Sequence, residues 1–195
     1  MMMTVLTQRL IATPVWVHLG ATLLSFVAFQ GTRIYLDKLY AASQHPVDFA
    51  TGQLAFDGGV TLGYYEAMRA GGTFGIYVQT QLFDFAFIAS VMLFGLCFGT
   101  LIARMGGQGS LTRKIGVGAS IAAITGGTLD TLENMMSFVL MQFEAAIPQV
   151  LALIYSSFAA LKFVALTSAM GLAVVALALG LLGMLAQQVR ATQAT

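Results

Sequence analysis

Residues 115–143 read IGVGASIAAITGGTLDTLENMMSFVLMQF, and this stretch guides the interpretation of the rest of the chain. It is long and apolar enough to cross a bilayer, because a spanning helix needs about 20 mostly apolar residues. It nevertheless contains Asp130 and Glu133. Ionised groups at membrane depth cost ~2.5 kcal/mol or more, so they usually face a bundle interior and have a function. The stretch therefore predicts a spanning helix with a functional polar face.

The composition of the whole chain agrees with this prediction. Of its 195 residues, 58% are hydrophobic and 9% are charged, whereas a soluble domain carries about 25% charged residues. So few charges cannot cover a water-facing surface, and we expect the lipid bilayer to surround most of the protein. The net charge of +1 argues against a nucleic-acid partner, which requires a basic patch. A single cysteine, Cys97, excludes an internal disulfide.

Four apolar stretches are long enough to span a membrane. They cover about residues 10–35, 76–103, 115–143 and 150–185. The first contains Pro14 and His18 and lacks a convincing cleavage site, so we interpret it as an uncleaved span rather than a signal peptide. The predicted fold is all-α: an integral membrane four-helix bundle with up-down-up-down topology, forming one domain over residues 1–195.

Positive charge in short loops indicates the orientation of such a bundle. Arg104, Arg113 and Lys114 flank the link between the second and third spans, and Arg9 and Arg190 flank the termini. We therefore predict that both termini are cytoplasmic, in a multi-pass protein of a bacterial inner membrane (plasma membrane).

The outer loop, about residues 36–75, is the only substantial segment outside the predicted spans. Within it, TLGYYEAMRAGG predicts a short helix with Thr61 as its N-cap and with Gly71 and Gly72 at its end. Its apolar face would carry Tyr64, Tyr65 and Met68. We expect this helix to lie flat at the membrane surface, either as a cap on the bundle or as a lid over a substrate.

Polar side chains of the third span recur at helical spacing. Asp130, Asn134 and Ser137 are spaced i, i+4 and i+7, and Glu133 lies three residues after Asp130. Residues three and four apart share a helix face. The acidic pair, the amide and the hydroxyl should therefore form one polar stripe.

Two other spans carry charged residues that we expect at a similar depth. Asp84 lies about 10 Å inside the second span, with Gln81 nearer the surface, and Lys162 lies about 18 Å inside the fourth. Tyr155 precedes Lys162 by seven residues and shares its face. A lysine is the expected compensation for buried acids, because an unpaired buried ion is far costlier than a paired one. If the fourth span begins nearer Phe158, the lysine would instead reach the outer interface.

These residues make up the predicted site. The ligand- or proton-binding residues are Asp84, Asp130, Glu133, Asn134 and Lys162, and the pocket-lining residues are Gln81, Ser137 and Tyr155. Three acids against one lysine leave an excess of negative charge, so either a carboxyl is protonated or a cation binds. Alternatively, the network only locks the helices together.

Several other chemistries are not predicted. No Glu-x-x-His pair for a di-iron bundle is present, and the two histidines, His18 and His45, do not form a zinc constellation. No P-loop ending follows the glycines of the inner loop. We therefore predict no metal site and no cofactor. His18, away from the acidic cluster, is expected to be structural, with a proton entry point as the alternative.

Three sequence elements together resemble small, mostly bacterial four-helix membrane proteins of uncharacterised function. They are G-x-Y-x-x-x-Q-L-x-D at residues 75–84, L-D-x-x-E-N at residues 129–134, and Lys162 in the last span. The resemblance covers about residues 64–162. It implies the architecture and the choice of site residues, but no activity. A looser similarity to sterol-isomerase and sigma-2-like proteins, which also hold carboxylates in a membrane pocket, is analogy only.

Three functions fit these observations. The first is a binding protein or small carrier for a cation, a proton or a small amphipathic ligand, expected to form a homodimer. The second is a membrane enzyme that acts on a lipid or isoprenoid by acid–base chemistry. Its pocket would be lined by Phe83, Phe85, Phe87, Met135 and Phe138. The third is a structural or accessory subunit of a larger membrane complex.

Overall fold

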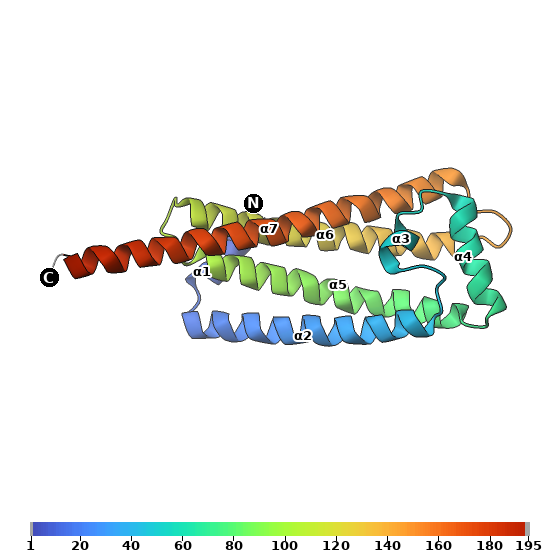
Figure 1. Cartoon of the computed structure of the whole chain (residues 1–195), viewed down its shortest axis with the longest axis horizontal. Helices are drawn as coiled ribbons and strands as arrows, with labels where there is room; N and C mark the ends of the chain where they lie inside the picture. Colours follow the sequence, from blue (N-terminus) through green and yellow to red (C-terminus); the bar gives the residue numbers. More distant parts are fainter. Residues whose placement is uncertain (1, 194–195) are drawn as a thin grey trace. The chain divides into compact units, whose positions relative to one another are not determined.

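The computed structural model describes residues 2–193, and within that range the chain is helical with no strand. Figure 1 shows the helices in chain order: α1 (Met2–Ala12), α2 (Val15–Ala42), α3 (Phe49–Gln53), α4 (Gly58–Ala70), α5 (Phe74–Ala103), α6 (Leu111–Leu140) and α7 (Gln149–Gln193). Helices α2, α5, α6 and α7 are each long and apolar enough to cross a membrane. The predicted all-α class and the four candidate spans are therefore confirmed.

The first span differs most from its predicted bounds of 10–35. The chain breaks at Thr13 and Pro14, so that α1 ends at Ala12 and α2 begins at Val15. Proline has no N–H to donate, and it is tolerated at a helix start but not in a helix interior. Pro14 therefore ends one helix and precedes the next, which makes α1 a separate element that the hydropathy pattern did not reveal.

The described residues fold as two compact units. Unit 1 lies within Met1–Val27, Val91–Thr125 and Ala165–Thr195, and unit 2 within Ala28–Ser90 and Gly126–Val164. Unit 1 thus contains α1, the N-terminal parts of α2 and α6, and the C-terminal parts of α5 and α7. Unit 2 contains the remaining parts of these four helices together with α3 and α4.

In unit 1, small residues allow α5 and α6 to approach closely. A Cβ atom added at Gly116 would lie 2.8 Å from both the Gly99 carbonyl oxygen and the Ala103 amide nitrogen, closer than real Cβ atoms come. One added at Gly95 would collide with the Ala123 side chain. Around this contact, the buried core consists of Ile102, Ala119, Ala173 and Ala176. Backbone contact of this kind is typical of membrane helix pairs.

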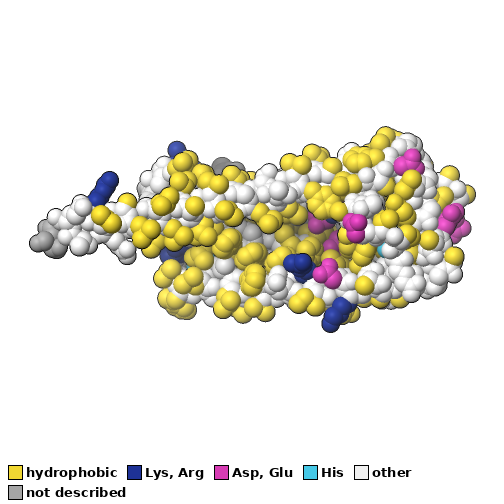
Figure 2. Space-filling view, in the orientation of Figure 1, with side chains coloured by type: hydrophobic (Ala, Val, Ile, Leu, Met, Phe, Trp, Pro, Cys, Tyr) yellow, Lys and Arg dark blue, Asp and Glu magenta, His cyan; other side chains and the backbone are white. Residues whose placement is uncertain are grey.

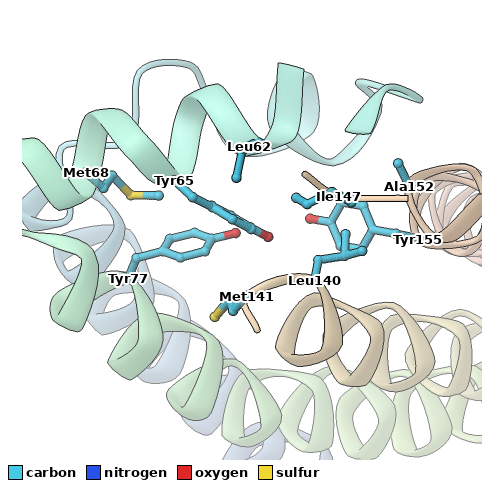
Figure 3. Packing of buried hydrophobic residues seen from close by; sticks show 9 residues of the cluster. All are labelled: Leu62, Tyr65, Met68, Tyr77, Leu140, Met141, Ile147, Ala152 and Tyr155. Carbon is cyan, nitrogen blue, oxygen red and sulfur yellow. The ribbon is translucent and has the colours of Figure 1, made fainter. Parts of the chain in front are cut away.

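In unit 2, α4 crosses the neighbouring helices and caps their buried core (Figure 1). Tyr65 and Met68 of α4 are each only 1% exposed. Figure 3 shows how they pack with the other core residues, namely Leu62, Tyr77, Leu140, Met141, Ile147, Ala152 and Tyr155. Of the two roles expected for this helix, the structure therefore shows the cap.

The N-cap predicted for α4 is wrong. The helix begins at Gly58, and its cap is Asp57, whose side chain accepts a hydrogen bond from Val60 N at 2.9 Å. Thr61 lies inside the first turn, where its hydroxyl donates to the Asp57 carbonyl oxygen. An aspartate is at least as good an N-cap as a threonine. The predicted end is correct: Gly71 is the C-cap, and Gly72 follows with a φ of +71°.

The segment between α3 and α4 is held by the start of α7. Gln149 accepts from Gly58 N at 3.0 Å and donates to the Phe56 carbonyl oxygen at 2.8 Å. Phe56 N in turn donates to Ser156 Oγ at 3.0 Å. Phe56 has a φ of +52°, which is a genuine outlier for a bulky residue. These three hydrogen bonds hold the residue in that conformation.

His45, between α2 and α3, packs among aromatic rings of unit 2. Its ring centroid lies 5.3 Å from that of Tyr40 and 5.4 Å from that of Tyr77. Burial lowers the pKa of His45, against the opposing effects of its hydrogen bond to the Val47 carbonyl oxygen and of Asp48. The pKa of His45 therefore lies below the unfolded value of about 6.5.

The sign of this shift predicts loosening of the segment in acid. A group with a depressed folded pKa contributes stability above its unfolded pKa, and this contribution is lost as the pH falls toward the folded pKa. We expect amide hydrogen exchange in residues 44–53, corrected for intrinsic rates, to quicken as the pH falls below about 6.5. His45→Gln should remove this dependence, and an unchanged pH response in that variant would contradict the assignment.

Candidate functional site

The polar stripe of α6 faces the interior of unit 2. Asp130, Glu133, Asn134 and Ser137 are all buried, and the most exposed of them, Asp130, is only 5% accessible. Their spacing places them on one helix face. The predicted stripe is therefore present, and its four side chains are directed at α5 and α7.

Lys162 of α7 lies between the two acids of this stripe. Its Nζ donates to Asp130 Oδ1 at 2.6 Å and also to Glu133 Oε2. The lysine is 4% exposed, so the alternative in which it reaches an outer interface is wrong. The reason is that α7 already begins at Gln149, which places Lys162 well within the helix. The ammonium group is thus shared by two buried carboxylates.

Gln81 of α5 links that helix to α6 through two hydrogen bonds. Its Nε2 donates to Ser137 Oγ at 2.7 Å, and Asn134 Nδ2 donates to the Gln81 carbonyl oxygen at 2.9 Å. Both bonds are buried. They fix the register of α5 against α6, and therefore the position of every polar side chain on the α5 face.

Asp84, one turn beyond Gln81, is the third acid of the cluster. It is only 3% exposed, and it makes no hydrogen bond or ion pair with any residue in the range 2–193. It lies close enough to Lys162 and to the acids of α6 to interact with their charges. The cluster therefore contains three carboxyl groups and one ammonium group, and Lys162 pairs directly with only two of the three acids.

Three buried oxygens around this cluster receive no hydrogen bond from any described residue. They are Gln81 Oε1, Glu133 Oε1 and Asn134 Oδ1. A buried acceptor without a partner costs about 1–3 kcal/mol. The Tyr65 hydroxyl is also unpaired in the described residues. The site is therefore rich in acceptors and negative charge, and poor in donors.

Three tyrosines extend the site toward α4. Figure 3 shows the hydroxyls of Tyr65, Tyr77 and Tyr155 directed toward one another in the buried core. Tyr155 also interacts with Glu133. The sequence predicted only Tyr155. Tyr77 precedes Gln81 by four residues, so the spacing rule that identified the α6 stripe could also have found it.

Gln53 is a further site residue that the sequence analysis missed. It lies in the five-residue helix α3, is 4% exposed, and donates from Nε2 to Glu133 Oε2 at 3.2 Å. Nothing in the loop sequence signals this contact, because a single short turn has no periodicity. Glu133 Oε2 therefore receives donors from both α3 and α7.

The aromatic lining predicted for a lipid pocket is only partly assembled. Phe85 and Phe138 lie 6.3 Å apart as stacked rings, and Phe83 and Phe87 are half-buried. Met135, in contrast, is 56% exposed, so its assignment to the pocket is wrong. It lies two residues after the buried Glu133, and helical residues two apart point in nearly opposite directions.

His18 belongs to unit 1 and makes contacts unrelated to the acidic cluster. Its Nε2 lies 3.0 Å from the Cys97 carbonyl oxygen and 3.1 Å from Thr100 Oγ1. Arg104 Nη1 donates to His18 Nδ1 at 3.4 Å and to the Thr13 carbonyl oxygen at 2.6 Å. Because arginine can only donate, Nδ1 accepts and Nε2–H donates. His18 thus joins α2 to α5, while Arg104 binds the chain end of α1.

Among residues 2–193, no group of three or more His, Cys, Asp or Glu side chains is arranged to hold a metal ion. No protein-family model, curated protein or solved structure matches this chain. The resemblance to small bacterial four-helix membrane proteins therefore stays a prediction. Function has to be inferred from the chemistry of the buried cluster.

Proposed function

We propose that this chain is an integral membrane protein whose four long helices cross the bilayer of a bacterial inner membrane. Their length and apolar composition support this. Hydrophobic side chains also cover much of the face that Figure 2 shows, with few charged groups between them. Unit 1 contains the N-terminal parts of α2 and α6 and the C-terminal parts of α5 and α7, and unit 2 contains the opposite ends. This alternation is expected for an up-down-up-down bundle with both termini on the cytoplasmic side.

We propose further that unit 2 binds a small monovalent cation, either an alkali ion or a primary ammonium group, in exchange for a proton. The observation that carries this proposal is the unpaired carboxyl of Asp84 beside a cluster that already contains two acids and one lysine. Adding a cation or a proton reduces the negative charge, whereas an anion would increase it. The ligand class follows from the sign of the charge.

The unpaired oxygens support the same ligand class. Gln81 Oε1, Glu133 Oε1 and Asn134 Oδ1 can only accept hydrogen bonds or coordinate a cation. A primary ammonium group offers three N–H donors, and alkali ions take oxygen ligands. Lys162 pairs with Asp130 and Glu133, which leaves Asp84 as the carboxyl that can exchange a proton for the cation. As a carrier, a chain of this size is expected to act as a homodimer.

An acid–base enzyme acting on a lipid is the second candidate. On the face that Figure 2 shows, acidic side chains lie recessed among hydrophobic ones. A lipid substrate could approach acids from such a surface, with one carboxyl protonated and another ionised. The exposed position of Met135 reduces the aromatic and apolar lining that this function requires, so cation binding remains the better-supported proposal.

Replacing Asp84 with asparagine tests the proposed site without breaking the ion pairs of Lys162. The wild-type protein should be stabilised against thermal unfolding by Na⁺ or by methylammonium, because a ligand that binds only the folded state raises its stability. In proteoliposomes loaded with a pH-sensitive dye, a gradient of the same cation should move protons. Asp84→Asn should lower the apparent affinity at least about tenfold, as expected for loss of a charged contact.

Asp37→Asn is the matched control, since Asp37 is an exposed acid on α2. It should bind the cations and move protons like the wild type. If neither cation stabilises the wild-type protein, or if Asp84→Asn binds and exchanges them normally, the proposed site is wrong. Stabilisation without flux would support binding and exclude the carrier.

A further inference from the structure

Acidic and basic residues are distributed unequally between the two units. All eight acidic residues of the sequence fall in the segments of unit 2. The segments of unit 1 hold no acidic residue and five of the nine basic ones: Arg9, Arg104, Arg113, Lys114 and Arg190. No acidic side chain of unit 1 can therefore neutralise these cations.

Two of these cations fasten α1 to the rest of unit 1. Arg104 donates to the Thr13 carbonyl oxygen just after α1, and Arg113 Nη2 donates to Gln8 Oε1 at 2.7 Å. The second bond joins α1 to the start of α6. The exposed cations Arg9 and Lys114 directly follow the two bonded residues in the sequence, so their positions on α1 and α6 adjoin this contact. Neither makes an ion pair or hydrogen bond with the described residues.

Exposed apolar side chains accompany these cations. Val5 and Leu6 of α1 and Leu111 at the start of α6 are exposed. Trp16, in the first turn of α2, is 73% exposed. Tryptophan together with arginine and lysine is characteristic of a membrane–water interface, where the rings lie at headgroup level and the cations reach outward. An anionic bilayer offers a plane of phosphates above acyl chains, which complements both features.

We propose that unit 1 binds the headgroups of anionic phospholipids at the contact between α1 and α6. Arg9, Arg113 and Lys114 supply the positive charge, and the exposed apolar side chains of α1 enter the lipid below. Each basic residue near an anionic surface increases the binding constant for that surface by about fivefold. This inference rests on the proposed membrane insertion, but it is independent of cation binding in unit 2.

The chain contains one tryptophan, Trp16, so its fluorescence reports on this region alone. The protein is reconstituted in bilayers that contain equal amounts of phosphatidylcholine and phosphatidylglycerol, with bromine on one lipid or on the other. Bromine quenches a nearby indole. We expect brominated phosphatidylglycerol to quench Trp16 more strongly than brominated phosphatidylcholine does, and we expect this preference to weaken as salt is raised.

Arg9→Gln combined with Lys114→Gln should bring the two quenching efficiencies together. Lys38→Gln, which changes an exposed lysine of unit 2, should preserve the difference. Thermal midpoints check that each variant is folded, and native mass spectrometry of retained phosphatidylglycerol provides a second measurement. Equal quenching by the two lipids in the wild type, or an unchanged preference in the double variant, would overturn the proposal. Absence of quenching by either lipid would overturn the membrane insertion as well.

Discussion

Lys162→Met is expected to lower the free energy of unfolding by about 3–5 kcal/mol. Methionine keeps an unbranched apolar chain but removes the ammonium group that Asp130 and Glu133 share. Both carboxylates are buried, so neither can recover its hydration when the cation is lost. Removing one partner of a buried ion pair is far costlier than never having formed the pair. The change in the free energy of unfolding is measured by equilibrium unfolding in mixed detergent micelles, with circular dichroism as the readout.

Two further variants show whether the loss comes from the buried charges. Lys38→Met changes an exposed lysine of α2 in unit 2 and should alter stability by less than about 0.5 kcal/mol. Adding Asp130→Asn and Glu133→Gln to Lys162→Met removes all three charges together, and this should restore much of the lost stability. A triple variant as unstable as Lys162→Met alone would show that loss of packing, rather than uncompensated charge, is responsible.

The second large effect is expected at Gly116 of α6. Gly116→Ala should destabilise the protein by about 1–3 kcal/mol, as overpacking does. The new methyl group would meet the Gly99 carbonyl oxygen and the Ala103 amide nitrogen, both backbone atoms of α5. Backbone cannot change rotamer to make room, so the helices must separate. The destabilisation should be visible although alanine is a better helix former than glycine by about 1 kcal/mol.

Gly118 provides a matched control on the same helix. A Cβ atom there would meet only Leu172 Cδ1, at an ordinary distance of 3.9 Å. Gly118→Ala should therefore be neutral or stabilising, by up to about 1 kcal/mol. Thermal midpoints of the two variants should move in opposite directions from the wild type or differ by several degrees. Equal midpoints would contradict the close approach of α5 and α6 at Gly116.

The sequence predicted the features that follow from spacing and charge. The α6 stripe was predictable because Asp130, Asn134 and Ser137 repeat at helical intervals. The pairing of Lys162 was predictable because burying three acids without a cation is so unfavourable. These arguments depend on one helix or on total charge, and neither requires knowledge of how distant segments meet.

Contacts made by loops were not predictable in this way. Gln53 reaches Glu133 only because of how α3 is placed, and a five-residue turn carries no pattern that indicates this. The N-cap of α4 is Asp57 rather than the predicted Thr61, because the spacing of apolar residues does not fix the first turn of a helix. Hydropathy also averaged across Pro14, which hid the break between α1 and α2. In each case, the deciding interaction involves a few residues and no repeat.

The two hydrogen bonds of Gln149 constrain the length of the chain between α3 and α4. One side-chain amide binds the peptide on both sides of Asp57, so the segment is fixed from the carbonyl of Phe56 to the amide of Gly58. Inserting or deleting a residue there would move one of these groups out of reach. In the link between α5 and α6, no side chain binds the peptides of Gly107 in this way, and a Cβ atom there would meet open space among the described residues. Insertions therefore belong at Gly107 rather than at residues 56–58, where identity is constrained as well as length, because a Cβ atom at Gly58 would collide with the Ile147 carbonyl oxygen.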